Sequence, residues 1–301
     1  MSGAVLVTGA AGLVGRAVAS TLRREGTAVF GLDLADDPGG SIVACDLRDA
    51  RRLAAITQSR EISAIVHCGA VSGPALHRDD PGYVARTNIE STVNLLELAV
   101  ARGIPRFVFA SSAAVYGRTP EDVMVEEERP LHPTSIYAAS KVAGEALVEA
   151  CSHQCGLSGV SLRIAAVYGP GRRTPCAIRD LILAGLEGKP ACLSYGRDQR
   201  YHYVHVGDVA DAVVAAVRAG SIRKPAYTIA ADRGITMGDL AELVRKIVPG
   251  PPVLVGDKED PLSDPQGPYD LDAVARDLGW RARITLPEGI RSYAAALLQE
   301  I

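Results

Sequence analysis

The chain has 301 residues, 48% of them hydrophobic, and a formal net charge of -3. This composition argues against a disordered protein and suffices for a sizeable core in one or two domains. Lysine and arginine are scattered along the chain, which argues against a nucleic-acid partner.

No apolar run has the length of a membrane span, and residues 4–10 are typical of a strand rather than of a signal peptide. We therefore expect a cytoplasmic protein with no membrane partner. The six cysteines form no Cys-x-x-Cys pair and have no matching histidine spacing. This pattern predicts neither a metal site nor a disulfide framework.

Short apolar runs typical of buried strands alternate with helical patterns. We predict strands at 4–8, 28–32, 42–45, 64–67, 106–110 and 160–166, and helices at 13–24, 48–58, 88–101 and 135–153. Such alternation indicates an α/β fold with a doubly wound, Rossmann-type parallel sheet covered on both faces.

The pattern changes after Tyr168, where Gly169, Pro170 and Gly171 indicate an exit from the sheet. We predict a Rossmann domain at 1–168, to which 204–225 returns. The segments 169–203 and 226–301 are expected to form a smaller C-terminal lobe. Within these parts, helices are expected at 209–218 and at 286–298.

A glycine-rich turn joins the first expected strand to the first helix. Glycines at 9, 12 and 15 let the backbone approach a pyrophosphate, and the helix start offers free amide donors. Asp33, at the end of the second expected strand, can accept both ribose hydroxyls and would repel a phosphate there, which predicts NAD rather than NADP. The expected cofactor contacts in the turn are Gly9, Ala11, Gly12, Leu13, Val14 and Gly15.

Tyr137 and Lys141 are four residues apart on an expected helix and so share a face. A charge at about 4 Å, with an effective dielectric near 20, is worth about 4 kcal/mol. That is roughly what is needed to lower a tyrosine pKa from about 10 to about 7. We therefore expect Lys141 to lower the pKa of Tyr137 and make it a base. The pair taken alone fits a solvated helix face equally well.

Four segments resemble the NAD-dependent epimerase/dehydratase family of extended short-chain dehydrogenases/reductases. They are TGAAGLVG at 8–15, SSAAVYG at 111–117, YAASK at 137–141 and VYGPG at 167–171. The resemblance implies a catalytic set of Ser112, Tyr137 and Lys141, with Lys141 also on the nicotinamide ribose. It assigns NAD binding to the first domain and substrate binding to the lobe.

The resemblance implies further cofactor contacts. Asp46 and Leu47 would lie against the adenine, Gly69 and Ala70 would line the cofactor with backbone atoms, and Asn88 would lie near the active-site end. An exposed Asp46 that starts a turn and an Asn88 that caps a helix are the alternatives. His67 is expected to be structural.

Departures from the family pattern bear on the substrate. Ala113 and Ala114 stand where dehydrating members carry an Asp-Glu pair, so dehydration is not expected. Ala166 replaces the asparagine that usually binds the diphosphate of a nucleotide sugar, and Arg200 falls one residue too early for the corresponding arginine. Losing two such contacts costs about 3–6 kcal/mol, which favours a smaller substrate.

The leading hypothesis is therefore an NAD-dependent oxidoreductase that oxidises a hydroxyl of a sugar, a sugar acid or a similar small polyol. The alternative is a nucleotide-sugar (UDP-hexose) 4-epimerase, and a non-catalytic dinucleotide sensor is the lesser alternative.

The candidate substrate-binding residues are Ser72, Ser112, Ala113, Arg172, Arg173 and His202, with Arg163 and His205 as further possibilities. Each of the arginines and histidines, taken singly, equally fits a surface group.

The resemblance also implies a homodimer in which helices 88–101 and 135–153 of two copies pair. Small residues at 139, 143, 146 and 150 would permit close packing of such helices. They would equally suit packing of the helix on its own sheet.

Overall fold

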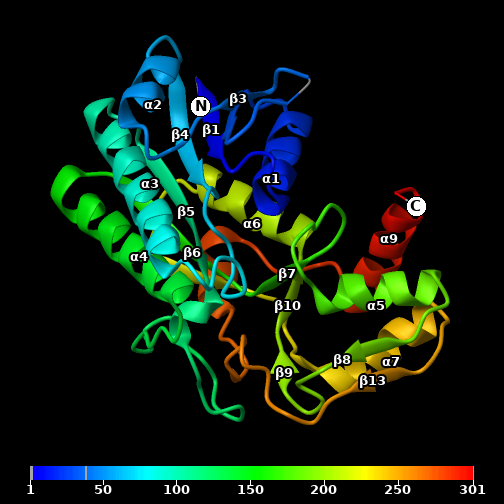
Figure 1. The fold of residues 1–301 in the computed structure, drawn as a ribbon. Helices are drawn as coiled ribbons and strands as arrows, with labels where there is room; N and C mark the ends of the chain where they lie inside the picture. The colour runs from blue at the N-terminus through cyan, green and yellow to red at the C-terminus, as the bar shows by residue number, and fades with distance from the viewer. Residues whose placement is uncertain (1–2, 38, 301) are drawn as a thin grey trace.

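The computed structural model describes residues 3–37 and 39–300. Its main sheet has seven parallel strands in the order β11-β6-β5-β4-β1-β2-β3 (Figure 1). The strands are β1 Ala4–Thr8, β2 Val29–Asp33, β3 Ile42–Ala44, β4 Ile62–His67, β5 Arg106–Ser112, β6 Ser158–Ile164 and β11 Ala226–Ile229. The predicted doubly wound α/β fold is confirmed.

Both faces of this sheet are covered, and for that reason its central strands are largely apolar and buried. All six residues of β4 are buried. Val5 and Val7 of β1 belong to one core cluster and Leu6, between them, belongs to another, as the alternation of side chains along a strand requires.

Two groups of helices form the covering layers. The helices α2 Ala50–Thr57, α3 Pro81–Ala101 and α4 Ile136–Cys155 cover one face. The helices α1 Leu13–Arg24, α6 Val206–Arg218 and α8 Asp272–Leu278 cover the other. Figure 1 shows α3 and α4 side by side along one flank of the sheet.

The helix ends follow local capping chemistry. Before α3, the Asp80 side chain accepts the Tyr83 amide at 2.9 Å and Pro81 occupies the first turn, so this helix begins seven residues before the predicted residue 88. Before α4, Ser135 accepts the Ala138 amide at 3.1 Å. Gly156 ends α4 in the left-handed conformation.

The smaller lobe has its own core. Its helices are α5 Ala177–Leu186, α7 Met237–Ile247 and α9 Leu286–Leu298, which bury residues such as Ile178, Leu240 and Ile290 together. Short strand pairs join its segments: β7 Ala166–Tyr168 with β10 Tyr203–His205, β8 Ala191–Leu193 with β13 Val253–Val255, and β9 Arg200–Tyr201 with β12 Ile235–Thr236.

The predicted lobe boundary needs a correction. The prediction places the segment 226–301 in the lobe, yet β11 pairs with β6 as the edge strand of the main sheet. Val274 of α8 is also buried in the core of that sheet. The crossover through α6 carries the chain back to the sheet edge, and β11 has only four residues, too few for a distinct periodic signal.

The sequence predicts neither a membrane-spanning segment nor a metal site. Over residues 3–37 and 39–300, no helix is long and apolar enough to span a membrane. The same described residues contain no cluster of three or more His, Cys, Asp or Glu side chains suited to a metal ion. All six cysteines lie within the described residues and are free.

Packing of α4 on β5 gives a first prediction. A Cβ atom at Gly144 would overlap the buried ring of Phe109. Overpacking costs about 1–3 kcal/mol, against a gain in helix propensity of about 1 kcal/mol. We expect Gly144→Ala to lower the free energy of unfolding by about 1 kcal/mol, and by at most about 2 kcal/mol, in urea denaturation.

The matched control is Gly220→Ala. A Cβ atom at Gly220 meets no heavy atom of the described residues within 4 Å. The urea midpoint of Gly220→Ala should equal that of the wild type. Equal stability of Gly144→Ala and Gly220→Ala would contradict the packing argument.

Candidate active site

Four strands of the main sheet end at the same edge, because they run parallel. Gly9 follows β1, Asp33 ends β2, Gly69 lies two residues after β4, and Ser112 ends β5. Ligands of open α/β sheets bind at this edge. The structure thus gathers the predicted cofactor and catalytic residues on one side of the sheet.

The glycine-rich turn leaves no room for larger residues. Gly9 has a φ of +64°, and a Cβ atom there would lie 2.8 Å from the Gly69 amide nitrogen. Gly12 is the N-cap of α1, so the first amides of that helix point outward without a side-chain cap. This is a backbone cradle for an anion, and it fits a pyrophosphate.

Asp33 is fixed beside this turn. Its carboxylate accepts the Ala11 amide at 2.9 Å and the Leu34 amide at 2.7 Å. A carboxylate so placed at the end of β2 matches the predicted ribose acceptor. The residues present therefore fit a dinucleotide.

The second predicted group of cofactor residues lies beside Gly9. Leu47 is buried, and a Cβ atom at Gly69 would lie 2.9 Å from its Cδ1 atom. The Gly69 amide donates to Thr8 at 3.2 Å, and Ala70 follows it half-buried. Asp46 forms an ion pair with Arg48 at 2.6 Å, so its carboxylate is engaged within its own turn.

Asn88 lies in the middle of α3, where it cannot cap the helix, and Asp80 is the cap. Its amide accepts from the Val71 amide at 2.8 Å and donates to the Val71 carbonyl at 3.1 Å and to Ser140 at 2.9 Å. These three hydrogen bonds place Asn88 against the loop that follows β4, and its predicted cofactor contact stays a prediction. A buried amide must be hydrogen-bonded. The Asn88 amide meets this need at Val71 and thereby holds the loop of residues 69–72.

The structure brings Ser112, Tyr137 and Lys141 together where α4 packs on β5. The Lys141 ammonium donates to the Ala110 carbonyl at 2.7 Å and lies 5.9 Å from the centre of the Tyr137 ring. The Ser112 hydroxyl oxygen accepts the Ala114 amide at 3.2 Å, as the cap of the 3₁₀ turn η1 Ala113–Tyr116.

The electrostatics differ from the prediction. Burial raises the pKa of Tyr137, while the Ser112 and Ser72 hydroxyls and the charge of Arg172 oppose that rise. Burial lowers the pKa of Lys141 to about 8, with Cys68 and Glu145 opposing. The expected lowering of the Tyr137 pKa by Lys141 is therefore wrong here, because loss of hydration by a buried phenolate outweighs nearby positive charge.

Two predicted substrate residues reach this cluster. The Ser72 hydroxyl and the charge of Arg172 both lower the pKa of Tyr137. The Arg172 guanidinium donates to the carbonyls of Val167 and Pro175. Among the described residues, its buried Nε atom has no hydrogen-bond partner.

The other candidates lie elsewhere or are engaged. Arg173 is exposed. His202 is buried, with its Nε2 atom 3.3 Å from the Gln266 carbonyl. The Ala113 side chain is buried in the core and its carbonyl accepts from Gln266. Two further possibilities are also engaged, since Arg163 pairs with Glu145 at 2.8 Å and His205 caps α6.

Three residues at the site were missed by the sequence analysis. Glu145 accepts from the Ser111 hydroxyl at 2.5 Å, and its position four residues after Lys141 could have indicated it. Gln266 donates to Ala113 and Gly117, about 150 residues away, and no local pattern predicts this. Arg16, in α1, donates to the Gly171 carbonyl of the lobe at 2.9 Å.

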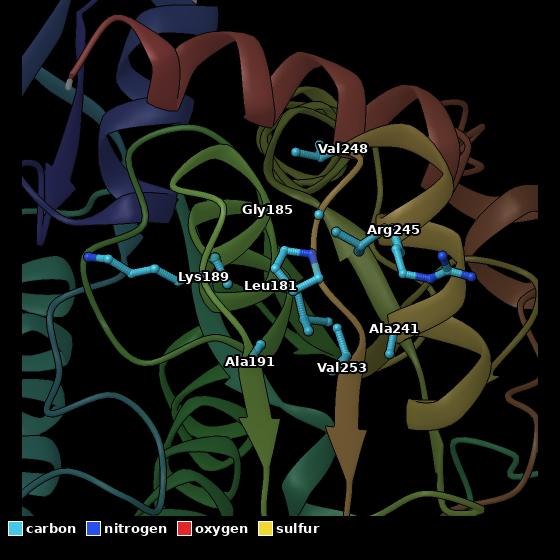
Figure 2. Close-up of a pocket in the computed structure, with 12 residues that line it drawn as sticks. Leu181, Gly185, Lys189, Ala191, Ala241, Arg245, Val248 and Val253 are labelled. Carbon is cyan, nitrogen blue, oxygen red and sulfur yellow. The ribbon is translucent and has the colours of Figure 1, made fainter.

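Two hollows on the surface lie away from Tyr137. Figure 2 shows one, lined by Leu181, Ala241 and Val248 between α5 and α7, with a volume of about 10 Å³. That is room for about one water molecule, so we interpret it as a packing gap. A shallow hollow of about 280 Å³ lies beside Glu25 and Trp280, next to the ends of α1 and α6.

Residues 5–230 match the NAD dependent epimerase/dehydratase family. The chain belongs to this family. Membership confirms the predicted family and its NAD cofactor. The glycine-rich turn and Asp33 are the residues that fit the dinucleotide.

Relatives within the family are sugar-nucleotide enzymes. UDP-glucose 4-epimerase from Streptomyces lividans is 31% identical over 279 residues, which cover 83% of each chain. UDP-glucuronate 4-epimerase 1 from Arabidopsis thaliana is 34% identical over 65% of this chain and 49% of that protein. The chain thus spans about half the length of this plant relative.

Solved structures agree over almost the whole chain. A UDP-glucose 4-epimerase from Thermus thermophilus, in complex with NAD, has a TM-score of 0.89 at 28% identity and covers 99% of both chains. One from Thermotoga maritima, with UDP-glucose, has a TM-score of 0.91 at 25% identity over 98% of this chain and 99% of that one.

The buried ammonium of Lys141 gives a stability prediction. Its pKa falls from 10.5 to about 8 on folding, which corresponds to a cost of about 3 kcal/mol while the amine is charged. Below pH 8 Lys141 is protonated in both the folded and the unfolded state, so the whole cost of burying its charge is present. We expect Lys141→Met to raise the free energy of unfolding at pH 7 by up to about 3 kcal/mol, less the loss of the Ala110 bond.

Between pH 8 and 10.5 the folded wild type loses the proton while the unfolded chain keeps it, so wild-type stability rises with pH. The difference between the variant and the wild type should therefore shrink over this range in urea denaturation. A difference that stays constant or grows with pH would contradict the assignment.

Proposed function

We propose that this protein is an NAD-dependent 4-epimerase of a nucleotide sugar, with a UDP-hexose or UDP-hexuronate as substrate. The carrying observation is the cluster of half-buried Ser112 with buried Tyr137 and Lys141 at the carboxyl edge of the sheet. Support comes from similarity over nearly the whole chain to UDP-glucose 4-epimerases. This favours the alternative of the sequence analysis over its leading hypothesis.

The chemistry needs a base, a hydrogen-bond donor and a positive charge beside one sugar hydroxyl. Tyr137 accepts the hydroxyl proton and later returns it. The Ser112 oxygen already accepts the Ala114 amide, which leaves the hydroxyl proton free to bond the reacting oxygen. Lys141 stays charged below pH 8, and its charge together with that of bound NAD would have to offset the burial that raises the pKa of Tyr137.

Bound NAD supplies the hydride acceptor and a further positive charge. The glycine-rich turn would hold its pyrophosphate and Asp33 its adenine ribose, while Lys141 would bond the nicotinamide ribose. Such a bound NAD would take up a hydride and give it back to the opposite face of the sugar carbon, which would invert that carbon with no net redox change.

Net oxidation of a free sugar or sugar acid is the second candidate function. One observation favours it: exposed Ala166 stands in β7, where nucleotide-sugar epimerases usually carry an asparagine that binds the diphosphate. Arg172, beside Tyr137, could instead neutralise a carboxylate on a smaller substrate.

We also propose that two copies pair through α3 and α4. Ala139, Ala146 and Ala150 are exposed on α4, so they do not pack on their own sheet. A face of small residues permits close approach of a second helix. Sedimentation at two protein concentrations would test this assembly.

The central test is turnover by the NAD-loaded protein. We expect UDP-glucose or UDP-glucuronate to be converted to its 4-epimer without net NADH, as followed by chromatography and absorbance at 340 nm. Tyr137→Phe removes the base and should lower kcat by about 100-fold or more.

Tyr195→Phe serves as the matched control, because Tyr195 is exposed in the lobe and its loss should leave kcat unchanged. Stoichiometric NADH from a free sugar acid, with no interconversion of UDP-sugars, would reject the epimerase and favour the second candidate.

A further inference from the structure

Residues 260–270, which we call the strap, connect β13 to α8 and bridge the lobe to the main domain. On the lobe side, Gln199 donates to the Ser263 carbonyl at 2.7 Å and accepts the Asp260 amide at 3.0 Å. The Tyr201 hydroxyl donates to the Asp260 carboxylate at 3.2 Å. The strap is thus fastened to the lobe at its start.

The second half of the strap is fastened to the main domain. The Gly267 amide donates to the Thr119 hydroxyl at 2.9 Å, and the Thr119 amide donates to the Pro265 carbonyl at 3.1 Å. Val125 adds two backbone bonds, to Pro268 at 2.7 Å and from Asp270 at 3.0 Å. Both anchor residues lie in the loop that follows η1.

Gln266 stands at the centre of this bridge. Its Nε2 atom donates to the Ala113 carbonyl at 3.0 Å and to the Gly117 carbonyl at 2.8 Å, and its Oε1 atom accepts the Tyr269 hydroxyl. Both Nε2 protons are therefore used, and the side chain is buried. The two carbonyls lie at the start of η1 and just after its end.

The turn that Gln266 holds sets the orientation of Ser112. The Ala114 amide, inside η1, donates to the Ser112 hydroxyl oxygen at 3.2 Å. A displacement of η1 would move this amide and release the hydroxyl from its present direction. The Ser112 hydroxyl also lowers the pKa of Tyr137, so the displacement would reach the base.

We propose that Gln266 is a positioning residue for Ser112, which it holds in place through the turn η1. The inference rests on the proposed function. This role explains why Gln266 donates both of its side-chain amide protons to carbonyls of the turn next to Ser112. A purely structural tie is already provided by the backbone bonds of Gly267, Pro268 and Asp270.

The test compares three variants of the NAD-loaded protein. Gln266→Met keeps the size of the side chain and removes both donors, while Gln266→Glu keeps the Oε1 acceptor. Gln199→Met loosens the strap on the lobe side only and is the matched control. Circular dichroism checks that each variant is folded.

In the epimerase assay, a misplacement of the reacting groups by about 1 Å can lower the rate about 100-fold. We expect Gln266→Met to lower kcat by at least about tenfold, with KM and the affinity for NAD changed by less than about threefold. Gln266→Glu should recover part of this loss as the pH falls, because a protonated carboxyl can donate one of the two bonds. Gln199→Met should leave kcat near that of the wild type.

A second measurement does not depend on turnover. The tyrosinate absorbance of each protein, minus that of the same protein carrying Tyr137→Phe, reports the titration of Tyr137. The Ser112 hydroxyl lowers the pKa of Tyr137, so its misorientation should move this titration to higher pH. We expect the shift in Gln266→Met and not in Gln199→Met.

The outcomes separate the two proposals. Unchanged kcat and an unchanged titration in the Gln266 variants would overturn the positioning role, as would an equal shift in Gln199→Met. A wild type that converts no nucleotide sugar would reject the proposed function, while the titration would still decide the role of Gln266.

Discussion

The site depends on one buried charge. The Lys141 ammonium is almost fully buried and donates to the Ala110 carbonyl, with the ring of Phe109 4.8 Å away. A charge in such a place is destabilising unless it is compensated. The backbone carbonyl, the aromatic face and the charge of Glu145 compensate in part, and together they fix the helix α4 on β5.

A buried ion pair between α4 and β6 supports this arrangement. Glu145, on the same face of α4, pairs with Arg163 of β6 and accepts the Ser111 hydroxyl. Ser111 of β5 therefore points toward α4, where its hydroxyl reaches Glu145. The pair thereby aligns β5, β6 and α4, although a buried ion pair contributes less stability than its Coulomb energy suggests.

Periodicity alone predicts much of the fold, and local spacing alone predicts little of the electrostatics. The elements at 4–8, 13–24 and 286–298 match the structure because each has a strong pattern and clear ends. The spacing of Tyr137 and Lys141 places both correctly but carries no information on burial, which decides the direction of the pKa. Gln266 lies in an irregular segment, and its partners are distant in sequence.

Arg16 ties the first turn of α1 to the lobe loop at Gly171, where even a methyl group would collide with its guanidinium. The lobe cannot swing away from the dinucleotide domain until this tie breaks. In the proposed epimerase one hydride is removed from the substrate and then returned to it. Slow exchange of the coenzyme with the bulk solution would favour such a reaction. Such a catalyst would work independently of the oxidation state of the surrounding pyridine-nucleotide pool.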